Sequence, residues 1–449
     1  MSMSHSNLHV IVGLGVTGLS CARYLKNQGV PVAITDTRLY PPNLDELLQY
    51  YPDIPLVLGR LDAALLAEAS HIIISPGIAL SEPLIAEQIA RKVTVLGDIE
   101  LFARAVNVPV IAITGTNAKS TVTTLVGKMA QAAGYKVQVG GNLGIPALDL
   151  LMQHPDTNLF VLELSSFQLE TTYSLQPHVA AILNITPDHM DRYHNLEEYC
   201  QAKHRVYQHC HTAIANSDDQ LTTMNNADVK KQFYFTLNEP KQHEFGLIKK
   251  EGVTYLAYEN ELLLPAHELP IPGKHYQANA LAALAIGYGF GLPFAPMLKI
   301  LREFKGLPHR CQLVRKRNEV AWYNDSKGTN VGATQAALIG LGSEINGKLI
   351  LIAGGVGKNA DFSPLIPVIQ KYVRHVVLIG EAAPIFTALL ADRVPFSLAQ
   401  NMDEAVQQAD THAKARDSVL LSPACASFDM FKNYEHRGEI FTECVEKLM

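Results

Sequence analysis

The stretch ITGTNAKST, which begins at Ile113, has the composition of a loop that binds phosphate groups. It follows the apolar run VPVIAI and precedes a helix-like segment, VTTLVGKMAQAAG. A strand, a loop and a helix in this order place backbone N–H groups and a lysine around the phosphates of ATP, and the hydroxyls that follow Lys119 suit Mg²⁺. The loop is not the standard G-x-x-x-x-G-K-[ST], because Ala118 replaces the second glycine and Gly115 lies too close to the lysine.

A second glycine-rich loop, GLGVTG, runs from Gly13 to Gly18. It follows the apolar stretch LHVIVG, opens a helix-like segment, and is followed by another apolar stretch that ends at Asp36. This order is typical of a unit that binds a nucleotide diphosphate at a helix N-terminus, with the acid near a ribose. A turn that merely needs glycine is the alternative. Two such loops indicate that the chain binds two phosphate-bearing ligands.

Further polar residues follow apolar strand-like stretches in the middle of the chain. Glu163 ends LFVLEL, and His189 follows VAAILNIT. An acid at such a strand end can hold the Mg²⁺ of bound ATP, directly or through water. Taken alone, His189 is more often structural and Lys203 is more often a solvated surface residue. A zinc site is a weak alternative, because no tetrahedral spacing fits Cys200, His204, His209, Cys210 and His211.

The last third repeats this pattern with three polar segments. AWYND continues into SKGTN, LILIAGGVGKNADF carries Lys358, and VLLSPACASFDMFKNYEHRG carries Ser427, Lys432 and Tyr434. Ligands of open α/β sheets bind beyond the carboxyl ends of the strands, so these segments are candidate binding loops. Turn glycines and helix caps are the alternative reading. Cys425 could act as a nucleophile, but no pattern of partner His and Asn residues in the sequence supports that role.

The alternation of continuous apolar strands with helices predicts parallel sheets covered on both faces. Breaks near Gly97-Asp98 and near 305–308 divide the chain into three α/β domains, at 1–97, 98–306 and 307–449. We expect a Rossmann-like first domain, a central P-loop-type domain with a mainly parallel sheet, and a Rossmann-like last domain. The span 216–272 looks less regular than the rest.

Composition excludes several classes of protein. A hydrophobic fraction of 48% with 18% charged residues is typical of a packed globular chain. The net charge of −6 shows no basic excess for a nucleic acid. The apolar run 281–294 is too short to span a bilayer, the N-terminus has no basic leader, and no C-x-x-C pair occurs. We therefore expect a cytoplasmic protein that binds neither nucleic acid nor membrane. We also expect a monomer.

The loop T-G-T-N-x-K-S-T resembles the ATP loop of the Mur ligases, which build the peptide stem of peptidoglycan. The resemblance extends over essentially the whole chain, through NITPDHMDRY, GLPHRCQ, NDSKGTN, AGGVGKNADF and SPACASFDMFKNYEHRG. These segments are most similar to the member that adds D-glutamate. Related folylpolyglutamate synthetases begin close to their ATP loop, whereas a complete G-x-G-x-x-G unit precedes it here. The family usually carries glycine where this chain has Ala118, and alanine fits there only if its φ is negative.

The resemblance implies an ATP-dependent ligase that joins D-glutamate to UDP-N-acetylmuramoyl-L-alanine through an acyl phosphate, with ATP, two Mg²⁺ ions and a carbamylated Lys203. Closure of the three domains would exclude water from the intermediate. For ATP it implies Gly115, Thr116, Asn117, Ala118, Lys119, Ser120, Thr121, Asn279, Arg310 and Asp325. For the UDP-linked substrate it implies Val16, Thr17, Asp36, Thr37, Arg38, Gly77 and Asn142. For D-glutamate it implies Lys327, Thr329, Lys358, Ser427, Phe428 and Tyr434.

For the metal ions the resemblance implies Ser120, Glu163, His189 and the carbamylated Lys203. Its expected catalytic residues are Lys119, His189, Lys203 and Lys358. Three other functions remain open at this point. A dinucleotide-dependent dehydrogenase would explain only the first loop, a regulatory ATPase module would explain only the second, and another Mur ligase would differ in the amino acid that it adds.

Overall fold

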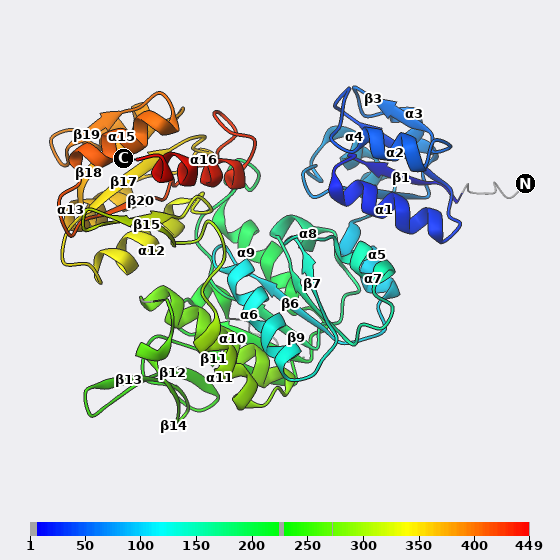
Figure 1. Cartoon of the computed structure of the whole chain (residues 1–449). Helices are drawn as coiled ribbons and strands as arrows, with labels where there is room; N and C mark the ends of the chain where they lie inside the picture. Colours follow the sequence, from blue (N-terminus) through cyan, green and yellow to red (C-terminus); the bar gives the residue numbers. More distant parts are fainter. Residues whose placement is uncertain (1–6, 224–228, 272, 449) are drawn as a thin grey trace, which may run out of the picture.

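The computed structural model describes residues 7–223, 229–271 and 273–448. The expectation that no leader begins the chain falls on the first six residues and lies outside this range. Three separate sheets organise the described residues. Figure 1 shows the N-terminal unit in blue at the upper right, the C-terminal unit in yellow to red at the upper left, and the central unit below them. The expected α/β class with three sheet-based units is confirmed.

The N-terminal unit is a five-stranded parallel sheet with helices between its strands. Its elements are β1 (His9–Val12), α1 (Val16–Asn27), β2 (Val32–Asp36), α2 (Leu44–Tyr50), β3 (Leu56–Leu58), α3 (Ala63–Glu68), β4 (His71–Ile74), α4 (Pro83–Ala90) and β5 (Thr94–Leu96). The strand order is β3-β2-β1-β4-β5. The order reverses between β1 and β4, so the glycine-rich loop that follows β1 lies at the switch point where such sheets bind ligands.

The central unit is built on a nine-stranded sheet. Its strands are β6 (Val110–Thr114), β7 (Val137–Gly141), β8 (Leu159–Glu163), β9 (Val179–Ile182), β10 (Thr212–Asn216), β11 (Lys231–Phe235), β12 (Glu244–Lys250), β13 (Val253–Tyr258) and β14 (Glu261–Pro265). Their order is β14-β13-β12-β11-β10-β9-β6-β8-β7. Among the strands that the structure describes here, only the pairs β12–β13 and β13–β14 are antiparallel. The span that looked less regular in the sequence is therefore mostly an extension of this sheet.

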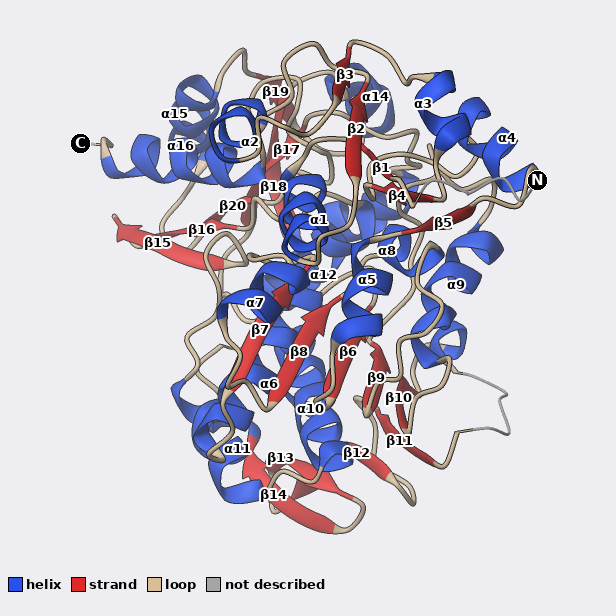
Figure 2. Cartoon of the chain, turned by 90° about the vertical axis from the view of Figure 1, so that its right-hand side faces the viewer, coloured by secondary structure: helices blue, strands red, loops and turns tan. Residues whose placement is uncertain are grey.

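The helices of the central unit cover both faces of the sheet (Figure 2). They are α5 (Asp98–Ala105), α6 (Lys119–Ala132), α7 (Ala147–Gln153), α8 (Ser166–Glu170), α9 (Leu196–His204), α10 (Lys274–Phe290) and α11 (Phe294–Glu303), with short 3₁₀ turns η1 (Arg205–Tyr207), η2 (Gln220–Thr222) and η3 (Ala266–Glu268). In β6, Ile111 and Ile113 pack into the cluster that contains α6 and α10, whereas Val110 and Ala112 pack into the cluster that contains α5 and α7. Every residue of β6 is buried, which explains its continuous apolar sequence.

The C-terminal unit is a six-stranded sheet in which only β15 runs antiparallel. Its elements are β15 (Gln312–Arg317), β16 (Val320–Asn324), α12 (Val331–Gly342), β17 (Leu349–Gly354), η4 (Ser363–Leu365), α13 (Ile366–Tyr372), β18 (Val373–Ile379), α14 (Ala383–Leu390), β19 (Phe396–Leu398), α15 (Met402–His412), β20 (Ser418–Leu421) and α16 (Tyr434–Glu446). The order is β15-β16-β20-β17-β18-β19. Among the described residues, no helix is both long enough and apolar enough to cross a membrane.

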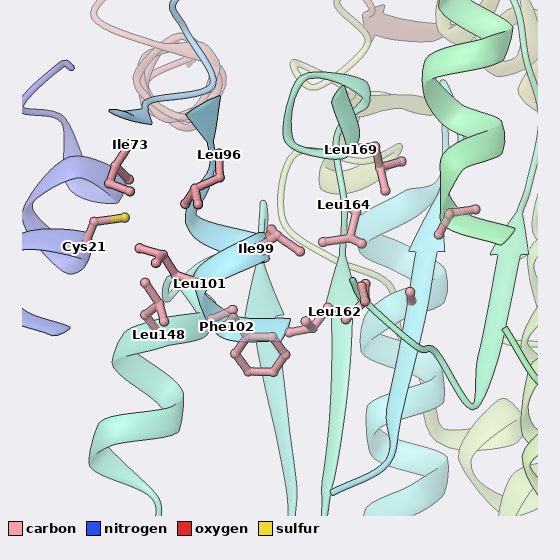
Figure 3. Packing of buried hydrophobic residues seen from close by; sticks show 14 of the residues in the cluster. Cys21, Ile73, Leu96, Ile99, Leu101, Phe102, Leu148, Leu162, Leu164 and Leu169 are labelled. Carbon is pink, nitrogen blue, oxygen red and sulfur yellow. The ribbon is translucent and has the colours of Figure 1, made fainter. Parts of the chain in front are cut away.

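The N-terminal and central units share one apolar cluster. Figure 3 shows Cys21 and Ile73 of the N-terminal unit beside Leu101 and Leu148 of the central unit. The C-terminal unit meets the central unit differently, through polar side chains and glycine backbone. A Cβ atom placed on Gly340 of α12 would lie 2.4 Å from the imidazole Nδ1 of His275. The two outer units are therefore attached to the centre by interfaces of different chemistry.

Candidate active site

The phosphate-binding loop lies between β6 and α6, at the carboxyl edge of the central sheet. Asn184, just beyond β9, fixes the loop: its side-chain oxygen accepts the Asn117 N–H at 2.8 Å, and its carbonyl accepts the Thr116 N–H at 2.9 Å. The Lys119 ammonium donates to the carbonyls of Gly115 and Thr116 at 2.9 Å each. Burial lowers the pKa of Lys119, and the carboxylate of Glu163 opposes that effect most strongly. The lysine is thus held in the loop by the loop's own backbone.

The expectation that Ala118 has a negative φ is wrong. Ala118 sits just before α6 with φ of +66°, in the left-handed region. The hydrogen bonds that Asn184 accepts from the N–H groups of Thr116 and Asn117, the two residues before Ala118, hold the loop in this turn. A methyl group in this region costs about 1–2 kcal/mol because Cβ approaches the following carbonyl. The loop thus keeps a backbone conformation that glycine adopts without strain, and Ala118 is strained in it.

Replacing Ala118 by glycine is therefore expected to raise the midpoint of thermal unfolding by about 1–2 °C. Relief of the left-handed strain outweighs the extra chain entropy of glycine, which is about 0.4–1 kcal/mol. Differential scanning calorimetry of the intact chain checks this. Ala132, the exposed last residue of α6, is the matched control. Ala132→Gly should lower the midpoint slightly, since glycine costs about 1 kcal/mol inside a helix and less at its last residue. A lower unfolding midpoint for both variants would contradict the inference that Ala118 is strained.

A buried carboxylate faces this loop from the end of β8. Glu163 is 3% exposed, and its Oε1 accepts a hydrogen bond from the Asn142 side chain at 2.9 Å. Its Oε2 is buried without a hydrogen-bond partner among the described residues. Burial alone would raise the pKa of Glu163, but Lys119, Asn142 and Ser120 hold it below its usual value. An unpartnered anionic oxygen near a serine hydroxyl and a phosphate loop fits Mg²⁺, which binds through few protein ligands plus phosphate and water.

Lys203 lies beneath the same loop and is not a surface residue. It is 1% exposed, and its ammonium donates to the Gly115 carbonyl at 2.8 Å. Burial, with the nearby charge of Lys119, places its pKa well below the usual value. A neutral amine is the form that can react with CO₂. His189 lies nearby in sequence after β9, with φ of +57° and its Nε2 3.7 Å from the Asp188 carboxylate.

In the described structure, no group of three or more His, Cys, Asp or Glu side chains could hold a metal ion. The weak zinc alternative therefore gains no support. The pair of Ser120 and Glu163 would need phosphate oxygens or water to complete a metal site. This fits a metal ion that arrives with its nucleotide.

One cavity of about 220 Å³ lies between the loop, α10 and the C-terminal unit. Arg310 reaches across it, and its Nη2 donates to the Ser120 hydroxyl at 2.9 Å. Burial raises the pKa of the Asp325 carboxyl in this cavity to about 6. The cavity thus joins two units around the place where phosphates would lie. The expected ATP residues that line it are Asn117, Ala118, Thr121, Asn279, Arg310 and Asp325.

A second cavity, of about 510 Å³, lies over the glycine-rich loop of the N-terminal unit. The Asp36 carboxylate accepts the Leu14 N–H at 2.7 Å and the Arg38 guanidinium at 2.6 and 2.9 Å. Asp36 therefore holds the loop and Arg38 in place. Gln168 of α8 also lines this cavity, although the sequence did not single it out. All the residues expected for the UDP-linked substrate line it: Val16, Thr17, Asp36, Thr37, Arg38, Gly77 and Asn142.

The residues expected for D-glutamate lie on the C-terminal unit in different environments. Lys358 forms an ion pair with Asp188 of the central unit at 2.8 Å. Lys327 lines the first cavity, and its ammonium lies 3.6 Å from the centre of the Tyr434 ring. Burial lowers the pKa of Lys327 to about 8. Ser427 is buried, Phe428 is 74% exposed, and Thr329 donates its N–H to the Lys327 carbonyl.

Two further residues organise this region and were not among the expected site residues. Asn330 of the C-terminal unit donates to Asn117 at 3.2 Å and to Asp188 at 3.1 Å. Arg437 of α16 is wholly buried and donates to the Ser326 hydroxyl and carbonyl and to the Cys425 carbonyl. It thereby ties together the loops that carry Lys327 and Ser427. Asn330 could have been found as a helix N-cap, since its side chain caps α12.

Comparison with known proteins places the chain in a family. It is 51% identical over 446 residues, 99% of this chain and all of the relative, to the UDP-N-acetylmuramoylalanine–D-glutamate ligase of Coxiella burnetii (strain RSA 331 / Henzerling II). The chain belongs to the Mur ligase family. The Mur ligase relative of the same name from Pseudomonas putida is 51% identical over 98% of both chains, and that from Pseudomonas syringae pv. tomato is 52% identical over 98% of both.

Family models of Mur ligases match all three units. The Mur ligase MurD-like N-terminal domain matches 7–97, the Mur ligase middle domain matches 113–287, and the glutamate ligase domain matches 309–425. Solved Mur ligase structures share the fold. The UDP-N-acetylmuramate-alanine ligase MurC of Thermotoga maritima aligns with a TM-score of 0.62 at 18% identity, over 98% of this chain and 99% of that one. A pseudomurein peptide ligase type C from Methanothermus fervidus aligns with a TM-score of 0.61 at 17% identity, over 99% and 100%.

Proposed function

We propose that this Mur ligase joins D-glutamate to UDP-N-acetylmuramoyl-L-alanine with cleavage of ATP to ADP and inorganic phosphate, as a cytoplasmic monomer with domains at 1–97, 98–306 and 307–449. The observation that carries the proposal is the contact of Arg310 with Ser120. This contact brings the C-terminal unit against the phosphate-binding loop of the central unit. The central unit also contributes Asn142 to the cavity over the glycine-rich loop of the N-terminal unit. The full-length relatives named above support the substrate and the acceptor.

The proposed reaction has two steps. A carboxylate oxygen of the L-alanine end attacks the γ-phosphorus of ATP, the bond to the bridging oxygen breaks, and ADP leaves. The amine of D-glutamate then attacks the acyl carbon, the bond to the phosphate oxygen breaks, inorganic phosphate leaves, and the nitrogen loses a proton. Lys119 and Arg310 offset the negative charge that spreads over the transferred phosphoryl group. Closure of the C-terminal unit onto the loop keeps water from the acyl phosphate.

The residues on the central unit fit the expected metal. Ser120 and the unpartnered oxygen of Glu163 would hold one ion, and His189 with a carbamylated Lys203 would hold a second. When bound, Mg²⁺ supplies charge neutralisation at the phosphates. The low pKa of Lys203 supports carbamylation, because its amine is neutral at pH values where an ordinary lysine is charged. Mass spectrometry of the native chain with and without CO₂ tests that modification.

Phosphate release from ATP with Mg²⁺ and UDP-N-acetylmuramoyl-L-alanine tests the proposed function. D-glutamate, L-glutamate, L-alanine, meso-diaminopimelate and L-lysine are added one at a time. We expect release with D-glutamate alone, together with a product heavier by one glutamyl residue. Release with a different acceptor would identify another Mur activity, and release without any acceptor would favour an ATPase module.

Replacing Lys358 by alanine is expected to raise the KM for D-glutamate by about tenfold or more, with less change in the KM for ATP. A carboxylate loses a charge-assisted hydrogen bond worth about 1.5–3 kcal/mol. Initial rates at varied D-glutamate and varied ATP measure both constants. Lys371, exposed on α13 of the same unit, is the matched control. An equal rise in both constants would contradict the D-glutamate role.

A further inference from the structure

A tight turn of the N-terminal unit lies at the edge of the cavity over the glycine-rich loop. It spans residues 75–78, directly after β4, and the Ile78 N–H donates to the Ser75 carbonyl at 2.9 Å. Ser75, Pro76, Gly77 and Ile78 all line the cavity. Apart from its chain neighbours, a Cβ atom placed on Gly77 would meet no atom of the chain within 4 Å. The turn therefore presents bare backbone to open space at this position.

Two contacts anchor this turn, and they come from different units. Within the N-terminal unit, the Ser75 hydroxyl donates to the Gly13 carbonyl of the glycine-rich loop at 2.9 Å. From the central unit, the guanidinium of Arg192 donates through Nη1 to the Pro76 carbonyl at 2.7 Å and through Nη2 to the Ile78 carbonyl at 3.2 Å. Arg192 is not among the described residues that line the cavity. It therefore contacts the turn and not the cavity.

The guanidinium of Arg192 is itself fixed in place. Its Nη2 also donates to the Glu170 carboxylate at 2.8 Å, and its central carbon lies 4.1 Å from the centre of the Phe167 ring. The other oxygen of Glu170 accepts the Tyr193 hydroxyl. The side chain of Arg192 is only 14% exposed. An arginine held by an anion and by an aromatic face is preorganised to donate in a fixed direction.

This contact sets the direction of a neighbouring N–H group. In a trans peptide the carbonyl and the N–H of the next residue point to opposite sides of the chain. The Pro76 carbonyl points toward Arg192, so the Gly77 N–H in the same peptide plane points away from Arg192. No hydrogen bond within the described part of the chain uses this N–H. Rotation of the peptide would break the bond to Arg192, so the guanidinium holds a free donor in one orientation.

We propose that Arg192 is a positioning residue for the UDP-linked substrate. By holding the carbonyls of Pro76 and Ile78, it keeps the Gly77 N–H in place as a donor to the oxygens of that substrate, and this role rests on the proposed function. Phosphate oxygens accept charge-assisted hydrogen bonds, which are the stronger kind. A turn without this contact would sample other peptide orientations, and the affinity falls in proportion to the fraction of chains that keep the binding orientation.

Arg192 is not needed to attach the N-terminal unit to the central unit. The two units share the apolar cluster that contains Leu101 and Leu148. In addition, Arg23 of α1 forms an ion pair with Asp149 of α7 at 2.7 Å. Loss of the Arg192 contacts should therefore loosen the turn without releasing the unit that carries it.

The test is Arg192→Met in the full chain, with binding of UDP-N-acetylmuramoyl-L-alanine measured by calorimetry without ATP. We expect the Kd and the KM for this substrate to rise about tenfold, as for a turn that keeps its binding orientation about a tenth of the time. The kcat and the KM for ATP should stay nearly unchanged. Arg192→Lys keeps the charge without the two-pronged geometry, so its Kd should lie between those of the wild type and Arg192→Met.

Hydrogen exchange followed by mass spectrometry reports on the turn itself. The Ile78 N–H closes the turn by its bond to the Ser75 carbonyl. We expect the peptide that contains this N–H to exchange faster in Arg192→Met than in the wild type, because local opening is easier once the contacts from the central unit are lost.

Arg205 provides a matched control, since it makes the same kinds of contact within the central unit. It donates to the Leu169 and Thr172 carbonyls at 2.6 Å each, and its guanidinium carbon lies 5.2 Å from the centre of the Tyr173 ring. It is not among the described residues that line the cavity. Arg205→Met should lower the unfolding midpoint and leave the Kd for UDP-N-acetylmuramoyl-L-alanine nearly unchanged.

An Arg192→Met chain that binds the substrate as the wild type does would overturn the role of Arg192 alone. A raised Kd without faster exchange in the turn would do the same, and so would an equal rise in Arg205→Met. If Arg192→Met does not fold, Arg192→Lys takes its place in each comparison, with a smaller rise in Kd expected. A wild type that binds no UDP-N-acetylmuramoyl-L-alanine would overturn both this role and the proposed function.

Discussion

Replacing Lys119 by methionine is expected to lower kcat/KM for ATP by about 10³-fold, since a preorganised donor aimed at transition-state charge contributes that order of magnitude. The ammonium already lies inside the loop, on the carbonyls of Gly115 and Thr116. Its loss also leaves the buried charge of Glu163 without its strongest opposite partner. Phosphate release at varied ATP, with D-glutamate and the UDP-linked substrate in excess, measures the effect.

The matched control for this prediction lies on the same helix. Lys128 of α6 is exposed, and Lys128→Met should leave kcat/KM within about twofold, as a surface substitution usually does. A Lys119→Met enzyme that keeps more than a tenth of the wild-type value would show that the loop binds ATP without using this charge.

Replacing Arg437 by methionine is expected to lower the midpoint of thermal unfolding by about 8 °C. Three acceptors, two on Ser326 and one on Cys425, lose their donor, and removing one side of a buried charged network costs about 3–5 kcal/mol. Part of this loss is offset because the guanidinium no longer has to be buried, a cost that lowers its pKa to about 10. The KM for D-glutamate should rise as well, because Ser326 and Cys425 precede Lys327 and Ser427 in the candidate binding loops.

Scanning calorimetry and initial rates at varied D-glutamate check the Arg437 prediction. Arg416, whose side chain is 74% exposed, provides the comparison. Arg416→Met should shift the midpoint by less than about 2 °C, since surface substitutions stay within about 0.5 kcal/mol. An Arg437→Met chain with an unchanged midpoint and a raised KM would show that the arginine acts on the ligand and not on the two loops.

Much of the fold could be predicted because its strands are buried on both faces. VIAIT of β6 and LILIAG of β17 are continuous apolar runs, and every residue in both is buried. The hairpin strands β12 to β14 could not be predicted from the sequence, because they are only partly buried. In β12 the pattern fades from buried to exposed at Lys249 and Lys250, so neither a continuous run nor a clean alternation marks it.

The candidate site divides in the same way. Loops at the carboxyl ends of strands could be found from sequence, since parallel strands deliver their ends to one edge of the sheet. Arg437 could not be found, because within YEHRGEI it reads as an ordinary exposed helix arginine. Its burial depends on how α16 packs over two distant loops. The left-handed backbone of Ala118 was likewise hidden, since the hydrogen bonds of Asn184 that hold the loop come from a segment far along the chain.

The contrast between the two interfaces has a thermal consequence. Separating the N-terminal unit would expose the hydrocarbon around Cys21 and Leu101, which raises heat capacity and makes the equilibrium depend strongly on temperature. Separating the C-terminal unit would instead wet Lys358, Asn330 and Arg310, and polar exposure changes heat capacity in the opposite sense. The closure proposed for the C-terminal unit should therefore depend less on temperature than a separation of the N-terminal unit would.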